Sequence, residues 1–261
     1  MRLWDGELLT ASKKSGVITD GLIAWVDGRD PIGGEPYKTT TSGIKHYINN
    51  PIVERVSGFN LKYTAIGTAN DYPANDRYVY ITEGTLPGFY EINQTYHHYT
   101  WGKITSDGTD FGDFKGVKTM EAVIRSGAIR TIPKIPNSTD SNGRISYAST
   151  WIGTVYHVGI IYNGSYKDLG TKDSGFLNSV HVVATNEGGK GVLYVNGVRQ
   201  NLGNPTKTIV DFSDAIYFEG SSIGSTRARW LGSLRFYNRD LTEKEILQNY
   251  KYEQSLGRIG V

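Results

Sequence analysis

The fold is decided by the hairpin sequence VLYVNGVRQ, which occupies residues 192–200. The Asn-Gly pair at its centre is typical of a two-residue type I′ turn, because both residues tolerate positive φ. This turn pairs Val195 with Val198 on one face of the hairpin and Tyr194 with Arg199 on the other. We therefore predict that the two valines are core residues and that the Tyr–Arg pair faces solvent.

Short apolar stretches that end at turn residues recur along the rest of the chain. They lie at 22–26, 60–66, 77–81, 88–101 with a break inside it, 117–125, 155–162, 180–185, 215–219 and 231–237. A second Asn-Gly pair predicts another hairpin at 162–165. Many short strands separated by turn residues are typical of an antiparallel β-sandwich. We predict an all-β fold of this class.

One helix is expected, close to the end of the chain. Thr242 and Glu245 have the spacing of a capping box, in which each side chain accepts a hydrogen bond from the other residue's backbone. Leu241 is placed to contact Ile246, which would fix the angle at which the chain enters the helix. The helix should run to about residue 253 and stop before Gly257.

Composition excludes several classes of function. The 261 residues include no cysteine, which rules out disulfides, zinc-thiolate sites and cysteine nucleophiles. The formal net charge is only +2, with Lys and Arg scattered, so nucleic acid is not an expected partner. No stretch approaches the roughly 20 apolar residues of a membrane span, and the first residues do not resemble a signal peptide. We expect a protein that does not insert into membranes.

The chain divides into two parts at about residue 20. Residues 1–20 are polar and rich in small side chains, and we predict that they form an N-terminal arm or docking segment. Residues 21–261 should form one domain, since β-sandwiches reach this length as a single unit. No internal repeat or low-complexity tract interrupts it.

The last third of the chain resembles the laminin G-like jelly roll, a branch of the concanavalin A-like sandwiches. The sequences SVHVVAT at 179–185 and LYVNGV at 193–198 are similar to that family's "W-x-H-V-A-x-T … L-Y-V-N-G-V" hairpin. SIG at 222–224 and LGSLRFYNRDLT at 231–242 are similar to its closing segment. The resemblance implies a concanavalin A-like jelly roll with one short C-terminal helix. It specifies a fold and not an activity.

Sandwiches of this type include glycoside hydrolases, which carry Glu-x-Asp-x-x-Glu on one strand. That spacing places carboxylates on alternate residues, so that they share a face and flank the glycosidic bond. The most similar segment here, EINQT at 91–95, lacks the second and third carboxylates. We therefore expect a protein that is not an enzyme, and we assign no catalytic residue.

Aromatic residues offer candidate sugar-binding positions. In QTYHHYTW at 94–101, an extended backbone would place His97, Tyr99 and Trp101 on one face. Aromatic rings stack on sugar rings, so these residues and Trp151 are candidate carbohydrate-binding residues. The alternative interpretation is that one face of this stretch is core and the other a subunit interface.

The loop DGTDFGD at 107–113 offers three carboxylates: Asp107, Asp110 and Asp113. Calcium prefers oxygen ligands on such irregular loops, and laminin G-like domains often bind calcium. Asp and Gly are also the ordinary composition of a turn between strands. Calcium is therefore a candidate ligand, and no other cofactor is expected.

The resemblance also implies a class of function. Laminin G-like jelly rolls that end in an Arg-x-Tyr-Asn-Arg-x-Leu-Thr segment resemble domains of bacteriophage tail, fibre and head-decoration proteins. We expect a structural protein located in the virion, which contacts other virion proteins as a homo-oligomer and binds host-surface glycan. The alternative is a cellular carbohydrate-binding module or a degenerate glycoside hydrolase.

Overall fold

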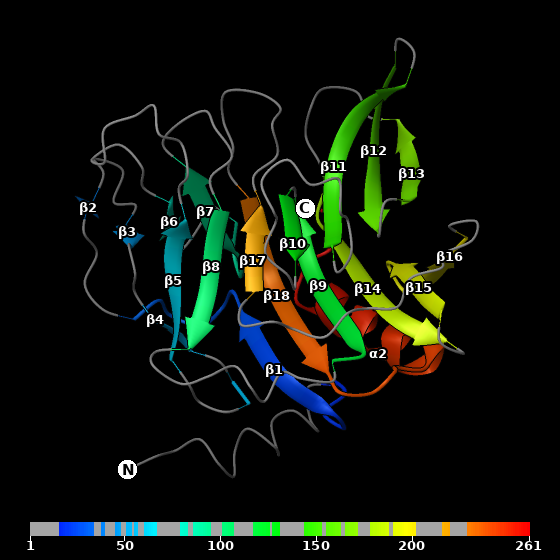
Figure 1. Cartoon of the computed structure of the whole chain (residues 1–261), viewed down its shortest axis with the longest axis horizontal. Coiled ribbons are helices and arrows are strands. Elements are labelled where there is room, and N and C mark those ends of the chain that lie inside the picture. Colours follow the sequence, from blue (N-terminus) through cyan, green and yellow to red (C-terminus); the bar gives the residue numbers. More distant parts are fainter. Residues whose placement is uncertain are drawn as a thin grey trace.

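The computed structural model describes two antiparallel β-sheets and a C-terminal helix (Figure 1). It describes the backbone at 16–33, 38–39, 45–47, 51–53, 55–56, 60–66, 79–82, 86–94, 101–106, 117–125, 127–130, 144–152, 155–162, 165–171, 178–187, 190–201, 216–219 and 229–261. Side chains are described at 16–33, 55–56, 86–90, 117–125, 178–187, 191–201 and 230–261. The predicted fold class, an antiparallel β-sandwich of the jelly-roll type with one short C-terminal helix, is confirmed.

The larger sheet has ten strands, and β1 joins it by pairing with β18. Their order is β16 (Val198–Gln200), β15 (Lys190–Val195), β14 (Val180–Glu187), β9 (Thr119–Arg125), β18 (Arg229–Tyr237), β7 (Tyr90–Gln94), β6 (Val79–Thr82), β3 (Lys45–Tyr47) and β2 (Lys38–Thr39), with β1 (Leu22–Asp27) off this path.

The smaller sheet has eight strands. Their order is β13 (Ser165–Thr171), β12 (Val155–Tyr162), β11 (Arg144–Ile152), β10 (Gly127–Arg130), β17 (Ile216–Glu219), β8 (Trp101–Ser106), β5 (Asn60–Ile66) and β4 (Pro51–Val53).

Most of the expected strands are present. The strands expected at 60–66 and 155–162 have those bounds, and Tyr162 pairs with Ser165 as the second Asn-Gly hairpin requires. β2, β3, β4, β10 and β11 were not predicted, and neither was β8 (Trp101–Ser106) beyond its first residue. The longest of these is β11 (RISYASTWI), in which polar and apolar residues do not alternate regularly. The two-residue alternation that identifies a strand in a sequence is therefore weak in β11, although this strand pairs along its length with β12.

Apolar side chains line the inner face of the ten-stranded sheet in the strands whose side chains are described. One register row crosses five strands from β15 to β1 and consists of Val195, Val182, Ala122, Leu234 and Val26. All five side chains are at most 4% exposed. Alternation along each strand turns this row away from the helix and toward the other sheet, where it forms the core of the sandwich.

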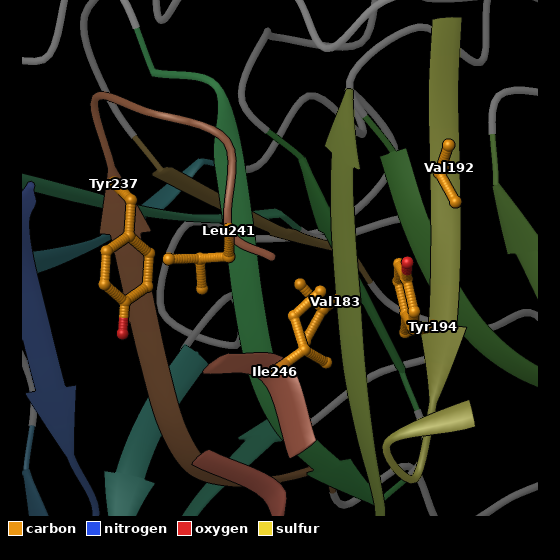
Figure 2. Close-up of a cluster of buried hydrophobic side chains, with 6 residues drawn as sticks. All are labelled: Val183, Val192, Tyr194, Tyr237, Leu241 and Ile246. Carbon is orange, nitrogen blue, oxygen red and sulfur yellow. The ribbon is translucent and has the colours of Figure 1, made fainter. Parts of the chain in front are cut away.

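The adjacent row, on the opposite face, lies under helix α2 (Glu243–Ser255). It consists of Tyr194, Val183, Glu121, Arg235 and Trp25. Apolar contacts there form a second cluster between sheet and helix, shown in Figure 2: Val183, Val192, Tyr194, Tyr237, Leu241 and Ile246. The helix therefore makes a third layer behind the ten-stranded sheet (Figure 1).

The hairpin at 192–200 has the predicted register but not the predicted burial. Asn196 and Gly197 have φ of 50° and 75°, as a type I′ turn requires, and Tyr194 pairs with Arg199. The prediction that Tyr194 faces solvent is wrong, since it is 1% exposed beneath α2. The prediction that Val198 is core is also wrong, because β16 is the edge strand and leaves it 62% exposed.

Helix α2 has the predicted start and capping. Thr242 is the N-cap and forms the capping box with Glu245, and Leu241 and Ile246 share the cluster of Figure 2. The helix ends at Ser255, before Gly257, whose φ of 68° suits a residue that follows a helix.

The residues that precede β1 contact this helix. Val17 is 4% exposed and packs with Trp25 and Tyr252, and the backbone N–H of Ile18 donates to Asn249 Oδ1 at 2.8 Å. Residues 16–20 of the predicted arm therefore lie against the sandwich, whereas 1–15 lie outside the described residues.

Candidate functional site

Charged side chains gather between the ten-stranded sheet and α2. We call this group the buried ion network. It comprises four carboxylates and four guanidinium groups in alternation: Glu121, Glu253, Asp27, Asp30, Arg235, Arg258, Arg29 and Arg55. Each carboxylate touches at least one guanidinium, and the equal numbers of the two groups balance their charges.

Glu121, in the middle of β9, is the inner end of the network. Its Oε1 atom pairs with Nη1 of Arg235, and its Oε2 atom accepts a hydrogen bond from Asn249 Nδ2 at 2.7 Å. His181 Nε2 lies 3.1 Å from Glu121 Oε1. All four side chains are 0% exposed. Three strands and the helix thus converge on one carboxylate.

The network continues through the helix to the chain that follows it. Arg235 Nη2 pairs with Glu253 Oε1, and Ser233 donates to the same oxygen at 3.1 Å. Glu253 Oε2 accepts from Arg258 Nη1 at 3.0 Å, and Arg258 Nη2 pairs with Asp27. Ion pairs therefore link β18, α2, the C-terminal segment and β1.

The outer end of the network reaches the surface beside β1. Asp27 contacts Nη2 of Arg29 at 2.7 Å and Nη1 of Arg55 at 3.0 Å. Arg55 also binds both carboxylate oxygens of Asp30 at 2.7 Å. The Arg29 side chain is 35% exposed, whereas Asp27 is 0% exposed. Only this outer part of the network reaches water.

Aromatic rings line the network. The guanidinium carbon of Arg55 lies 4.5 Å from the centroid of the Trp25 ring, and that of Arg235 lies 4.8 Å from the same ring. Tyr252 packs edge-on against Trp25 at 6.5 Å. Cation–π contact adds to the ion pairs in holding the guanidinium groups where water is excluded.

Two carboxylates of the network, Glu121 and Asp27, are held ionised. Burial alone would raise the pKa of Glu121, but the charge of Arg235, the nearby His181 side chain and a hydrogen bond from Asn249 lower it to about 2. Burial opposes ionisation of Asp27 as well, and Arg29, Arg258 and Arg55 hold its pKa well below its usual range. A general acid needs a pKa raised toward the working pH. These groups have the opposite property and anchor the helix instead.

The residues predicted to bind carbohydrate are placed only in part. Trp101 begins β8 and pairs with Ile66 and Glu219, and Trp151 lies in β11 opposite Tyr156. Both tryptophans belong to the eight-stranded sheet. The row that contains Trp101 crosses β11 at Ser146, five residues before Trp151, so the register does not bring the two positions together. His97 and Tyr99 lie outside the described residues.

The predicted calcium ligands Asp107, Asp110 and Asp113 also lie outside the described residues. Within the described part of the chain, no group of three His, Cys, Asp or Glu side chains is placed to hold a metal ion. No described helix is long and apolar enough to cross a membrane.

Sequence reasoning missed the buried ion network. Its strand members, such as Glu121 and Arg235, alternate with apolar residues and have the pattern of a solvent-facing row. A signal existed in the helix. Asn249 and Glu253 lie three and seven residues after Ile246, on the face that an amphipathic helix buries. Polar residues at those positions indicate a buried polar partner.

No family model matches the chain, and no curated protein sequence matches it. Solved structures with a similar fold exist. A Trypanosoma rangeli sialidase in complex with the inhibitor DANA aligns with TM-score 0.51 and 13% identity, covering 90% of this chain and 33% of that chain. A mutant of Trypanosoma rangeli sialidase displaying trans-sialidase activity aligns with TM-score 0.50 and 12% identity, covering 96% and 38%.

A weaker likeness, with TM-score 0.42 and 14% identity, is to domain 4 of AbnA, a GH43 extracellular arabinanase from Geobacillus stearothermophilus, in complex with arabinotriose. It covers 75% of this chain and 90% of that domain. The chain spans 33% and 38% of the length of these two sialidase chains. At these identities, the likeness to the sialidases establishes the β-sandwich fold alone.

Proposed function

We propose that this chain is a non-catalytic binding and scaffolding domain, and that it serves as a structural protein of a bacteriophage virion, in a tail, fibre or capsid decoration. One observation carries the non-catalytic part of the proposal. The acidic side chains that meet on the ten-stranded sheet are used to dock the helix, and water is excluded from them.

A glycoside hydrolase uses two carboxyl groups that flank the substrate, and one of them must hold a proton near neutral pH. Glu121 and Glu253 share Arg235, and both are 0% exposed. The pKa of Glu121 is lowered to about 2, so it has no proton to give. This acid pair, with one member on β9 and the other on α2, therefore suits a scaffold and not sugar hydrolysis.

The virion part of the proposal rests on the motifs of the last third of the chain. The segment similar to those of phage laminin G-like domains forms β18 and the start of α2, and it supplies Arg235 and the N-cap Thr242. In the proposed role, the sandwich contacts other virion proteins and host-surface glycan, and the N-terminal residues contribute to assembly.

The virion role is tested by locating the protein in its source cells. Particles released by those cells are separated on a density gradient, and each fraction is probed with an antibody raised against the purified chain. We expect the protein to sediment with particles that contain phage DNA. Protein found only in the soluble fraction, or only at the cell surface, would overturn the virion role.

A second candidate is a cellular carbohydrate-binding module. It is favoured by the position of Trp101 and Trp151 in the eight-stranded sheet, which no described helix covers. A glycan array of the purified chain tests this function, with Trp101→Ala and Trp151→Ala as variants and Val198→Ala, at an exposed edge position, as the control. Binding that is lost in a tryptophan variant and kept in the control supports a glycan site; no binding to any glycan counts against it.

A further inference from the structure

The outward side of α2 carries a short stripe of exposed residues. Glu243, Leu247 and Lys251 follow one another at intervals of four residues, and all three are exposed. In a helix this spacing places them on one face, about 6 Å apart along the axis. The buried residues Asn249 and Tyr252 belong to the opposite face. The stripe therefore points away from the sandwich.

An exposed apolar side chain lies in the middle of this stripe. Leu247 is 38% exposed. A Cβ atom at Gly197 would lie 3.1 Å from both Leu247 Cδ1 and Tyr250 Cδ1, so the hairpin turn touches the helix at this point. The middle of the stripe thus carries an exposed leucine beside the turn of the hairpin.

The charges of the stripe are complementary to themselves. If a second α2 is laid antiparallel on the first, with a two-fold axis through Leu247, residues four positions before and after the axis meet. Glu243 then faces Lys251 of the second copy, and symmetry repeats the pair. Leu247 meets its own copy at the centre. An arrangement that pairs every charge of the stripe while covering its apolar residue fits a second copy of this chain.

We propose that the exposed face of α2 is a homodimer interface, in which two helices pack antiparallel about Leu247 with two Glu243–Lys251 ion pairs. The interface lies on the opposite side of the ten-stranded sheet from the eight-stranded sheet, so both sandwiches remain free to bind other partners. It does not depend on whether the chain binds glycan or belongs to a virion.

The experiment uses charge reversal on the full chain, read by sedimentation equilibrium over a range of concentrations. Glu243→Lys and Lys251→Glu each convert two attractive pairs into two repulsive ones, and each should weaken self-association about tenfold or more. Lys118→Glu reverses a charge at an exposed position just before β9 and serves as the control. The cooperative melt of each variant shows that it is folded.

Two further experiments, in which charge-reversed variants are combined, test whether Glu243 and Lys251 meet in the proposed antiparallel arrangement. An equimolar mixture of the two single variants should form heterodimers, because the lysine introduced at position 243 of one chain then faces the glutamate introduced at position 251 of the other. The second pair in that heterodimer is the unchanged one, between Glu243 and Lys251. The double variant Glu243→Lys/Lys251→Glu should recover dimerisation, because exchanging the two charges restores both attractive pairs.

The outcomes that would overturn the proposal are equally specific. A monomeric parent protein would overturn it, as would single variants that dimerise as tightly as the parent and the Lys118→Glu control. Dimers that do not recover in the mixture would overturn the antiparallel register.

Discussion

The two faces of the ten-stranded sheet are built from neighbouring residues by different means. On the inner face, Leu234 and its row neighbours are apolar and pack toward the second sheet. On the outer face, one residue along, Arg235 and Glu121 are as completely buried, but as ions. Burial is thus achieved by exclusion of polar groups on one side and by their mutual neutralisation on the other.

This difference between the two faces indicates which substitutions the fold tolerates. An apolar core loses stability in proportion to the volume removed, and its neighbours relax into part of the space. A buried ion pair fails abruptly when one partner is removed, because the other charge remains in a place without water. The outer face should therefore be more sensitive to single substitutions and more tolerant of paired ones.

The largest loss of stability is expected when a charged residue of the outer face is removed. Glu121→Ala leaves Arg235 with only one carboxylate and leaves Asn249 Nδ2 without its carboxylate acceptor. We expect a loss of about 4 kcal/mol in the free energy of unfolding, measured in urea. Replacing the pair with Glu121→Leu and Arg235→Met should cost much less than the two single changes together. Additive costs would show that the ions do not depend on one another.

The inner face provides the matched measurement. Leu234→Ala removes a side chain that is 0% exposed and opposite Ala122 and Val26. We expect a loss of about 3 kcal/mol in urea unfolding, with helix α2 still docked, because no ion is disturbed. A larger loss than that of Glu121→Ala would reverse the order of sensitivity of the two faces.

The third test measures how the free energy of unfolding depends on pH, to which the ionised outer face contributes and the apolar inner face does not. The pKa of Glu121 is lowered from 4.5 to about 2 in the folded protein, so its contribution is complete above pH 4.5 and is lost as the pH falls toward 2. We expect the free energy of unfolding to decline by an amount on the order of 3 kcal/mol over that interval. Leu234→Ala should keep this slope. Glu121→Gln should flatten it, and an unchanged slope in that variant would assign the acid sensitivity to other carboxylates.

A smaller effect is expected at the start of the layer that covers the outer face. Thr242→Ala removes the side-chain oxygen that caps α2 while leaving the cluster of Figure 2 in place. The expected cost is about 1 kcal/mol in thermal or urea unfolding. Thr242→Ser keeps the hydroxyl and should cost less. Equal losses in the two variants would mean that the methyl group and not the cap is responsible.

The smallest effect is expected at the exposed rim of the outer face. Arg199 pairs with Glu187 at 2.7 Å, but their side chains are 55% and 49% exposed. Arg199→Ala should change the free energy of unfolding by less than about 0.5 kcal/mol. A cost near that of Glu121→Ala would contradict the view that burial, and not charge itself, makes the network sensitive.

The inner face and the hairpin register could be predicted from the sequence because alternation and the Asn-Gly turn are local signals. The burial of Tyr194 could not, since it depends on a helix about 50 residues further along the chain. The same is true of Glu121, whose neighbours on β9 give it the pattern of a surface residue. Local periodicity identifies which residues share a face, but not what covers that face.

The candidate site divides in the same way. The sequence identified aromatic residues, of which Trp101 and Trp151 fall on strands of the eight-stranded sheet. It gave no indication of the contacts made by Arg258, because Asp27 lies 231 residues away in the chain. An ion pair between such distant residues leaves no periodic pattern to detect.

The pairing of β1 with β18 has a consequence for synthesis on the ribosome. Trp25 is among the first residues of the fold to be translated, and its strand partner Arg235 is among the last. Contacts of such high sequence separation slow folding, because a long loop must close before they form. Among the described strands, β1 pairs only with β18, so this pairing cannot form until residues 229–237 have emerged. During that interval its apolar residues depend on chaperones or on transient contacts for protection from aggregation.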